Sequence, residues 1–282
     1  MNSIRLLNAY GPTEATIKIG RLQYPRQQQD FLVWPFVARG KLNAFYGPGK
    51  SGKSFLAMLC AVMAQGGVET ALGLRAKQAN VAIWDWEEQD APETPGATLN
   101  ERVQMVATGL GIEPPELIYL SCQRPITQLV HYLAEQVAEH DIDFVIIDSV
   151  EAACGSGNEH ENYEGRFFAF RQAIQEISRA HPFTVLCIDH VASADVASEK
   201  PGGTGKAFGT IFKTNEFRWS WEIRGKQDKQ SPYLSMAAFH GASNNGPKLA
   251  DVGLELDFTE DGVVRFSRVD IMENFEERAT RS

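Results

Sequence analysis

The sequence of 282 residues contains four cysteines, which lie far apart and form no Cys-x-x-Cys pair: Cys60, Cys122, Cys154 and Cys187. This spacing excludes a disulfide framework and a cysteine zinc site, and it favours reduced thiols. Long apolar runs are also lacking, because the longest covers residues 55–64 and a bilayer span needs about 20 residues. The first residues lack the apolar stretch of a signal peptide. We therefore expect a cytoplasmic protein with no membrane partner.

Positive charge is scarce as well. The chain has 27 Lys and Arg against 36 Asp and Glu, a formal net charge of −9, which argues against a surface that binds polyanions throughout. Residues 200–229 reverse this balance, with seven basic and three acidic side chains. Such a segment suits contact with the phosphate backbone of single-stranded DNA, through Lys200, Lys206 and Lys213. The alternative is an ordinary solvated charged face.

The apolar pattern predicts an α/β fold. Strands are expected at residues 42–46, 81–86, 117–120, 144–148 and 184–188, and helices from residue 53 and at 99–110, 126–140 and 163–180. This alternation is typical of a mostly parallel sheet flanked by helices. Four more strands, at 217–223, 233–239, 252–258 and 263–269, have the pattern of antiparallel additions, the last two joined as a hairpin through residues 260–262.

The domain organisation expected from this pattern is simple. Residues 31–272 form one domain, because neither a linker nor an internal repeat interrupts them. Residues 1–30 are polar and Gln-rich, which predicts a loosely ordered arm, and the charged residues 273–282 predict a frayed tail.

The most specific motif is G-x-x-x-x-G-K-[ST], which lies between a predicted strand and a predicted helix: Gly47, Pro48, Gly49, Lys50, Ser51, Gly52, Lys53 and Ser54. In that context the pattern indicates a phosphate-binding P-loop. Its glycines let the backbone wrap the phosphates, and the helix N-terminus favours anions. Lys53 would contact the β- and γ-phosphates, and the Ser54 hydroxyl would bind Mg²⁺. The guanine-reading [NT]KxD motif is absent, so we expect ATP and Mg²⁺ as cofactors.

Acidic residues lie at the ends of two of the predicted strands. Asp148 ends the apolar run 144–148, where a Walker-B carboxylate holds Mg²⁺; the alternative is an Asp that only caps a turn. Glu87 and Glu88 follow strand 81–86, on the edge where α/β sheets bind ligands. A carboxylate there can orient and polarise an attacking water. We assign this role to Glu87, with Glu88 as the fallback and a solvated acidic turn as the structural alternative.

A histidine follows the strand predicted at 184–188. His190 lies on the ligand edge of the predicted sheet, where it could sense the γ-phosphate; a purely structural histidine is the alternative. We expect no zinc role for His190.

With these motifs in order, the chain resembles the RecA-like P-loop ATPases, most closely the plasmid- and phage-encoded hexameric replicative helicases and their AAA-domain relatives. The resemblance covers residues 30–240. It implies that Glu87 activates water and that His190 occupies a sensor position. It also implies an arginine finger that reaches the neighbouring subunit's nucleotide, best matched by Arg218 with Lys213 as a companion. The active form would then be a homo-oligomer, expected to be a hexamer.

Three functions follow as hypotheses. The first is an ATP-driven motor on single-stranded DNA, a ring-forming replicative helicase. The second is an ATP-switched loader or regulator of replication or recombination that changes partners without unwinding DNA. The third is a small-molecule kinase, which would need an Arg-rich lid, and residues 224–229 offer only a weak match to one.

Overall fold

The computed structural model describes residues 29–87, 93–155, 163–190, 217–243 and 248–271. The chain divides into two units, Met1–Asp30 and Phe31–Ser282, and the elements below belong to the second. Several sequence predictions lie outside the described residues: the arm up to residue 28, the tail from residue 273, Glu88, Lys200, Lys206 and Lys213.

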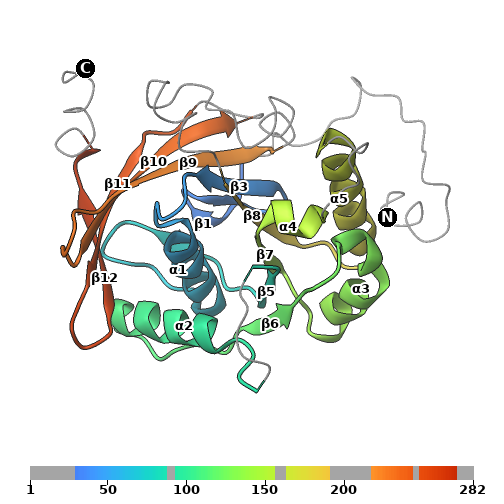
Figure 1. The fold of residues 1–282 in the computed structure, drawn as a ribbon, viewed down its shortest axis with the longest axis horizontal. Coiled ribbons are helices and arrows are strands. Elements are labelled where there is room, and N and C mark those ends of the chain that lie inside the picture. Colours follow the sequence, from blue (N-terminus) through green and yellow to red (C-terminus); the bar gives the residue numbers. More distant parts are fainter. Residues whose placement is uncertain (1–28, 88–92, 156–162, 191–216, 244–247, 272–282) are drawn as a thin grey trace, which may run out of the picture. The chain divides into compact units, whose positions relative to one another are not determined.

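A nine-stranded sheet organises the second unit (Figure 1). Its strands are β3 (Leu42–Gly47), β5 (Val81–Asp85), β6 (Ile118–Ser121), β7 (Phe144–Asp148), β8 (Thr184–His190), β9 (Trp219–Lys226), β10 (Tyr233–Ser243), β11 (Val252–Phe258) and β12 (Val264–Val269). They lie in the order β12-β11-β10-β9-β3-β8-β7-β5-β6. Neighbours from β9 to β6 are parallel, and those from β9 to β12 are antiparallel. The predicted α/β fold, with a mostly parallel sheet and antiparallel C-terminal strands, is confirmed.

Strand β9 corrects one detail of the sequence interpretation. Residues 217–223 were expected as an antiparallel addition, but β9 runs parallel to β3 and is antiparallel only to β10. A strand pattern shows which residues face a core and leaves the identity of the neighbouring strand open. The residues of β9 alone therefore do not determine whether this strand runs parallel or antiparallel to its neighbours.

Helices cover both faces of the sheet (Figure 1). Helices α1 (Lys53–Gly66) and α2 (Ala97–Leu110) contribute to one apolar core, and α3 (Val130–Glu139), α4 (Val150–Cys154) and α5 (Tyr163–Ile177) contribute to the other. Strand β7 serves both, because Ile146 faces the first core and Val145 and Ile147 face the second. This alternation is why an unbroken apolar run marks a central parallel strand.

Some elements were not anticipated from the sequence. A small sheet of order β2-β1-β4 contains β1 (Phe31–Trp34), β2 (Val37–Ala38) and β4 (Arg75–Ala76). The helix expected at 126–140 is divided into a 3₁₀ turn, η1 (Ile126–Gln128), and α3. Among the described residues, no helix has the length and apolar character needed to cross a membrane.

Candidate nucleotide-binding site

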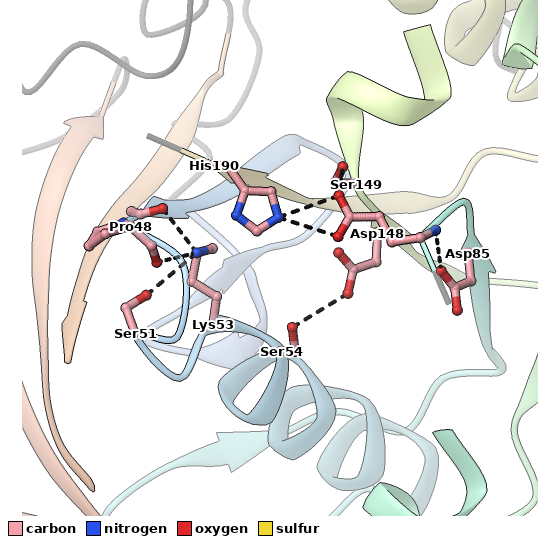
Figure 2. Close-up of polar contacts among 10 residues, drawn as sticks. Pro48, Ser51, Lys53, Ser54, Asp85, Asp148, Ser149 and His190 are labelled. Atoms are coloured by element: carbon pink, nitrogen blue, oxygen red, sulfur yellow. Dashed lines mark hydrogen bonds and ion pairs between the residues drawn. The ribbon is translucent and has the colours of Figure 1, made fainter. Parts of the chain in front are cut away.

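The carboxyl ends of four parallel strands bring several of the predicted site residues together (Figure 2). Gly47 at the end of β3 is in register with His190 at the end of β8. Asp148 at the end of β7 is in register with Asp85 at the end of β5. Ligands of open α/β sheets bind outside this edge. One edge of the sheet therefore carries the P-loop, Asp148, Glu87 and His190.

The P-loop backbone is packed tightly against strand β9. A Cβ atom at Gly47 would lie 2.1 Å from the carbonyl oxygen of Ile223, and one at Gly225 would lie 2.7 Å from the Cα atom of Ser51. Both glycines are therefore required for the close approach. Gly225 was not identified from the sequence, because the contact depends on the unanticipated pairing of β9 with β3.

Lys53 is held inside the loop that precedes α1. Its Nζ donates hydrogen bonds to the carbonyl oxygens of Gly47, at 2.9 Å, and Pro48, at 2.7 Å (Figure 2). The side chain is buried, and burial lowers the pKa of Lys53 to about 8, against the opposing effect of Asp148, Asp189 and Glu87. These acids favour the ammonium form. A buried cation thus lies at the start of the helix, where phosphates bind in P-loops.

Ser54 and Asp148 form a pair of oxygen donors from two elements. The Ser54 hydroxyl, on α1, donates to Oδ2 of Asp148, on β7, at 3.5 Å. Burial, Glu87 and Asp85 raise the pKa of Asp148 to about 7, and a bound cation would favour its ionised form.

The oxygen atoms of Ser54 and Asp148 fit Mg²⁺, which takes one or two protein oxygen ligands together with phosphates and waters. Among the described residues, no group of three or more His, Cys, Asp or Glu side chains is arranged to hold a metal alone. The donors fit a Mg²⁺ ion carried by a nucleotide.

Glu87 lies at the centre of a polar cluster. Its carboxylate accepts a hydrogen bond from the Ser149 hydroxyl, and its Oε2 lies 3.4 Å from Nε2 of His190 (Figure 2). The hydrogen bond with His190 lowers the pKa of Glu87 and raises the pKa of His190. Glu87 is therefore ionised at neutral pH. The sequence did not reveal the contact of Ser149, which is buried. Its position directly after Asp148 was the one feature of the sequence that pointed to the site.

Arg218 lies at the opposite edge of the sheet, where strands β3 and β9 begin. It is exposed and immediately precedes β9, and its backbone N–H donates to the carbonyl oxygen of Leu42 at 3.0 Å. Leu42 begins β3, whereas the P-loop follows the end of β3. Arg218 therefore does not join the cluster of its own chain. Its predicted companion Lys213 lies outside the described residues.

Comparisons with known proteins agree with the fold described above. The family model of the AAA domain matches residues 12–195. The crystal structure of the RadB recombinase superposes with a TM-score of 0.53 at 20% identity, over 83% of this chain and 93% of that chain. No curated protein matches the sequence. The matched RecA-like fold agrees with the one expected, and the more specific likeness to replicative helicases stays a prediction. The chain belongs to the AAA-domain family and is a P-loop ATPase of the RecA-like fold.

Proposed function

We propose that the protein hydrolyses Mg-ATP at the carboxyl edge of its parallel sheet. The observation that carries the proposal is the convergence of a buried lysine, a Ser–Asp oxygen pair and an ionised glutamate from three different elements: Lys53, Ser54 with Asp148, and Glu87. These are the parts that phosphoryl transfer to water needs: charge stabilisation, a place for Mg²⁺ and a group that orients water.

Each residue has its own proposed role in ATP hydrolysis. Mg-ATP supplies the phosphoryl group and the metal charge that transfer requires. Glu87 orients a water molecule and accepts its proton, and its lowered pKa keeps it ionised for that purpose. Ser149 and His190 restrict the carboxylate from two sides. Lys53 contributes a positive charge from a site shielded from water, where such a charge is most effective.

The proposed biological role is that of a ring-forming motor on single-stranded DNA, a replicative helicase. The position of Arg218 supports shared sites, because a finger at the far end of β3 could act only on another subunit's nucleotide. The basic residues Lys200, Lys206 and Lys213 are the proposed DNA contacts, in a chain that is otherwise acidic.

A second candidate is an ATP-switched loader or regulator of replication or recombination that does not unwind DNA. The structural likeness to a recombinase favours it, and so does the net charge of −9, because an acidic surface suits protein partners better than extended contact with DNA.

The deciding experiment measures phosphate release with and without single-stranded DNA, together with the native mass. The motor predicts an oligomer whose turnover rises with single-stranded DNA and which separates a forked duplex. Turnover and oligomer size that both ignore single-stranded DNA would contradict it. ATP-dependent association with a protein partner, without strand separation, would select the loader or regulator.

A further inference from the structure

The backbone at Glu87 is fixed by a neighbouring side chain. Oδ1 of Asp85 accepts a hydrogen bond from the backbone N–H of Glu87 at 2.8 Å (Figure 2). Asp85 is the last residue of β5 and is 6% exposed. A carboxylate that binds the N–H two residues later closes a local turn. This turn determines where the chain leaves the sheet and hence where the side chain of Glu87 begins.

The second oxygen of Asp85 is held from the neighbouring strand. The Tyr119 hydroxyl, on β6, donates to Oδ2 of Asp85 at 3.3 Å. Tyr119 is in register with Ile83, which lies two residues before Asp85 on β5. The side chains of Tyr119 and Asp85 therefore lie on the same face of the sheet. Asp85 thus connects the turn after β5 to a neighbouring strand.

The ring of Tyr119 is itself confined. A Cβ atom at Gly96 would lie 2.9 Å from Cδ1 of this ring, so the backbone before α2 touches it directly. Gly96 has φ 76, the left-handed conformation that glycine adopts most easily. The start of α2 therefore confines the ring of Tyr119. Tyr119 in turn holds Asp85, and Asp85 holds the backbone of Glu87.

We propose that Asp85 is a positioning residue for Glu87 and that Tyr119 holds Asp85 in place for this task; the inference rests on the proposed ATP hydrolysis. Ser149 and His190 confine the carboxylate of Glu87, and Asp85 confines its backbone. Both restraints matter because a displacement of about 1 Å at a reacting group can cost about 100-fold in rate.

The use of an aspartate at this position has a cost. Asp85 is buried next to its register partner Asp148, and two neighbouring carboxylates repel one another. An asparagine would close the same turn without this repulsion. The charged acceptor instead forms stronger hydrogen bonds with the N–H of Glu87 and the hydroxyl of Tyr119, as a group that positions a reacting side chain requires.

The activity test compares Asp85→Ala with Asp85→Asn, the matched variant that keeps an acceptor for Glu87 and a donor for Tyr119. We expect kcat for ATP to fall about 100-fold in Asp85→Ala and less than about 10-fold in Asp85→Asn, with KM and nucleotide affinity unchanged in both. Tyr119→Phe keeps the ring against Gly96 and loses one hydrogen bond, so its kcat should fall several-fold. If Asp85→Ala does not fold, Tyr119→Phe still tests the proposal, because it removes the hydrogen bond that holds Asp85.

A second measurement is independent of hydrolysis. Amide hydrogen exchange at Glu87, measured without nucleotide, should be slow in the wild type and in Asp85→Asn and faster in Asp85→Ala. A kcat for Asp85→Ala close to the wild type, equal losses in the Ala and Asn variants, or unchanged exchange at Glu87 would overturn the positioning role. Wild-type protein that does not hydrolyse ATP would overturn the proposed function itself, which separates the two failures.

Discussion

Nε2 of His190 lies 3.4 Å from both carboxylate oxygens of Glu87, across the end of the strand that carries Asp148. The three residues come from β8, from the segment after β5, and from β7 between them. Because each strand ends at the same edge, residues up to 103 positions apart form one polar cluster. The predictions below concern this cluster, the P-loop beside it and the residues that hold both.

Glu87→Gln should abolish turnover while leaving nucleotide binding intact. An amide cannot accept the proton of the attacking water, and loss of a general base costs about 10²–10⁴-fold. Phosphate release and the affinity for a fluorescent ATP analogue measure the two effects. Glu101→Gln, an exposed residue on α2, is the matched control. If Glu88→Gln, and not Glu87→Gln, removes turnover, the assignment of Glu87 is wrong.

The pair formed by Glu87 and His190 should be visible in the titration of the histidine. The carboxylate stabilises the imidazolium, so the pKa of His190 lies above its ordinary value of 6.5. Glu87→Gln should move this pKa back toward 6.5, as followed by NMR of the imidazole resonances. A pKa of His190 that is the same in wild type and Glu87→Gln would show that the contact does not persist in solution.

The same pair predicts a pH dependence of stability. His190, whose pKa is raised, stabilises the fold below 6.5 and loses this effect as the pH rises through its folded pKa. Glu87, whose pKa is lowered, stabilises it above 4.5 and loses this effect as the pH falls through its folded pKa. The stabilisation lost in His190→Asn should therefore be larger at about pH 5.5 than at about pH 8.5. Urea unfolding of both proteins at each pH measures this difference, and an equal loss at both would contradict it.

Gly225→Ala should damage the P-loop from outside the motif. The new methyl group would lie 2.7 Å from the Cα and the carbonyl oxygen of Ser51. Relief of such a clash moves the backbone and costs about 1–3 kcal/mol, so both nucleotide affinity and thermal stability should fall. Gly66→Ala, at the end of α1, meets side-chain methyl groups of Val68 at 3.2 Å and Ile112 at 4.0 Å and no backbone atom within 4 Å, so it should retain both. Equal behaviour of the two variants would show that β9 does not support the loop.

Arg218→Ala should reduce turnover without weakening nucleotide binding to isolated subunits. An arginine finger is worth about 10³–10⁵ in rate. Because Arg218 lies at the far end of β3 from its own P-loop, mixing the Arg218→Ala and Lys53→Ala variants should restore part of the activity at hybrid interfaces. A mixture that recovers no activity would count against a finger that acts in trans.

Sequence patterns predicted which edge of the sheet carries the candidate site, but not the residues that hold the site residues in place. The P-loop, Asp148, Glu87 and His190 were proposed because each ends or follows a predicted strand, and parallel strands end at one edge. Ser149 and Gly225 were not, because they contact residues that are distant in sequence, and Gly225 does so through the pairing of β9 with β3. Asp85 was not, because its hydrogen bond with Tyr119 depends on the pairing of β5 with β6.

Short elements were missed for a related reason. Strands β2 and β4 have two residues each and α4 has five, which is too few for a periodic pattern. Their conformations are set by packing, which the residues of the segments themselves do not encode.

The central claim is that this site hydrolyses Mg-ATP, and the most direct measurement is phosphate release by the wild type and by Lys53→Ala, with and without Mg²⁺. The account predicts Mg²⁺-dependent turnover in the wild type and a loss of at least about 100-fold in Lys53→Ala, the size typical for removal of one preorganised group. Lys248→Ala, which removes an exposed lysine, should turn over at the wild-type rate. Full turnover in folded Lys53→Ala protein, or none in the wild type, would contradict the account.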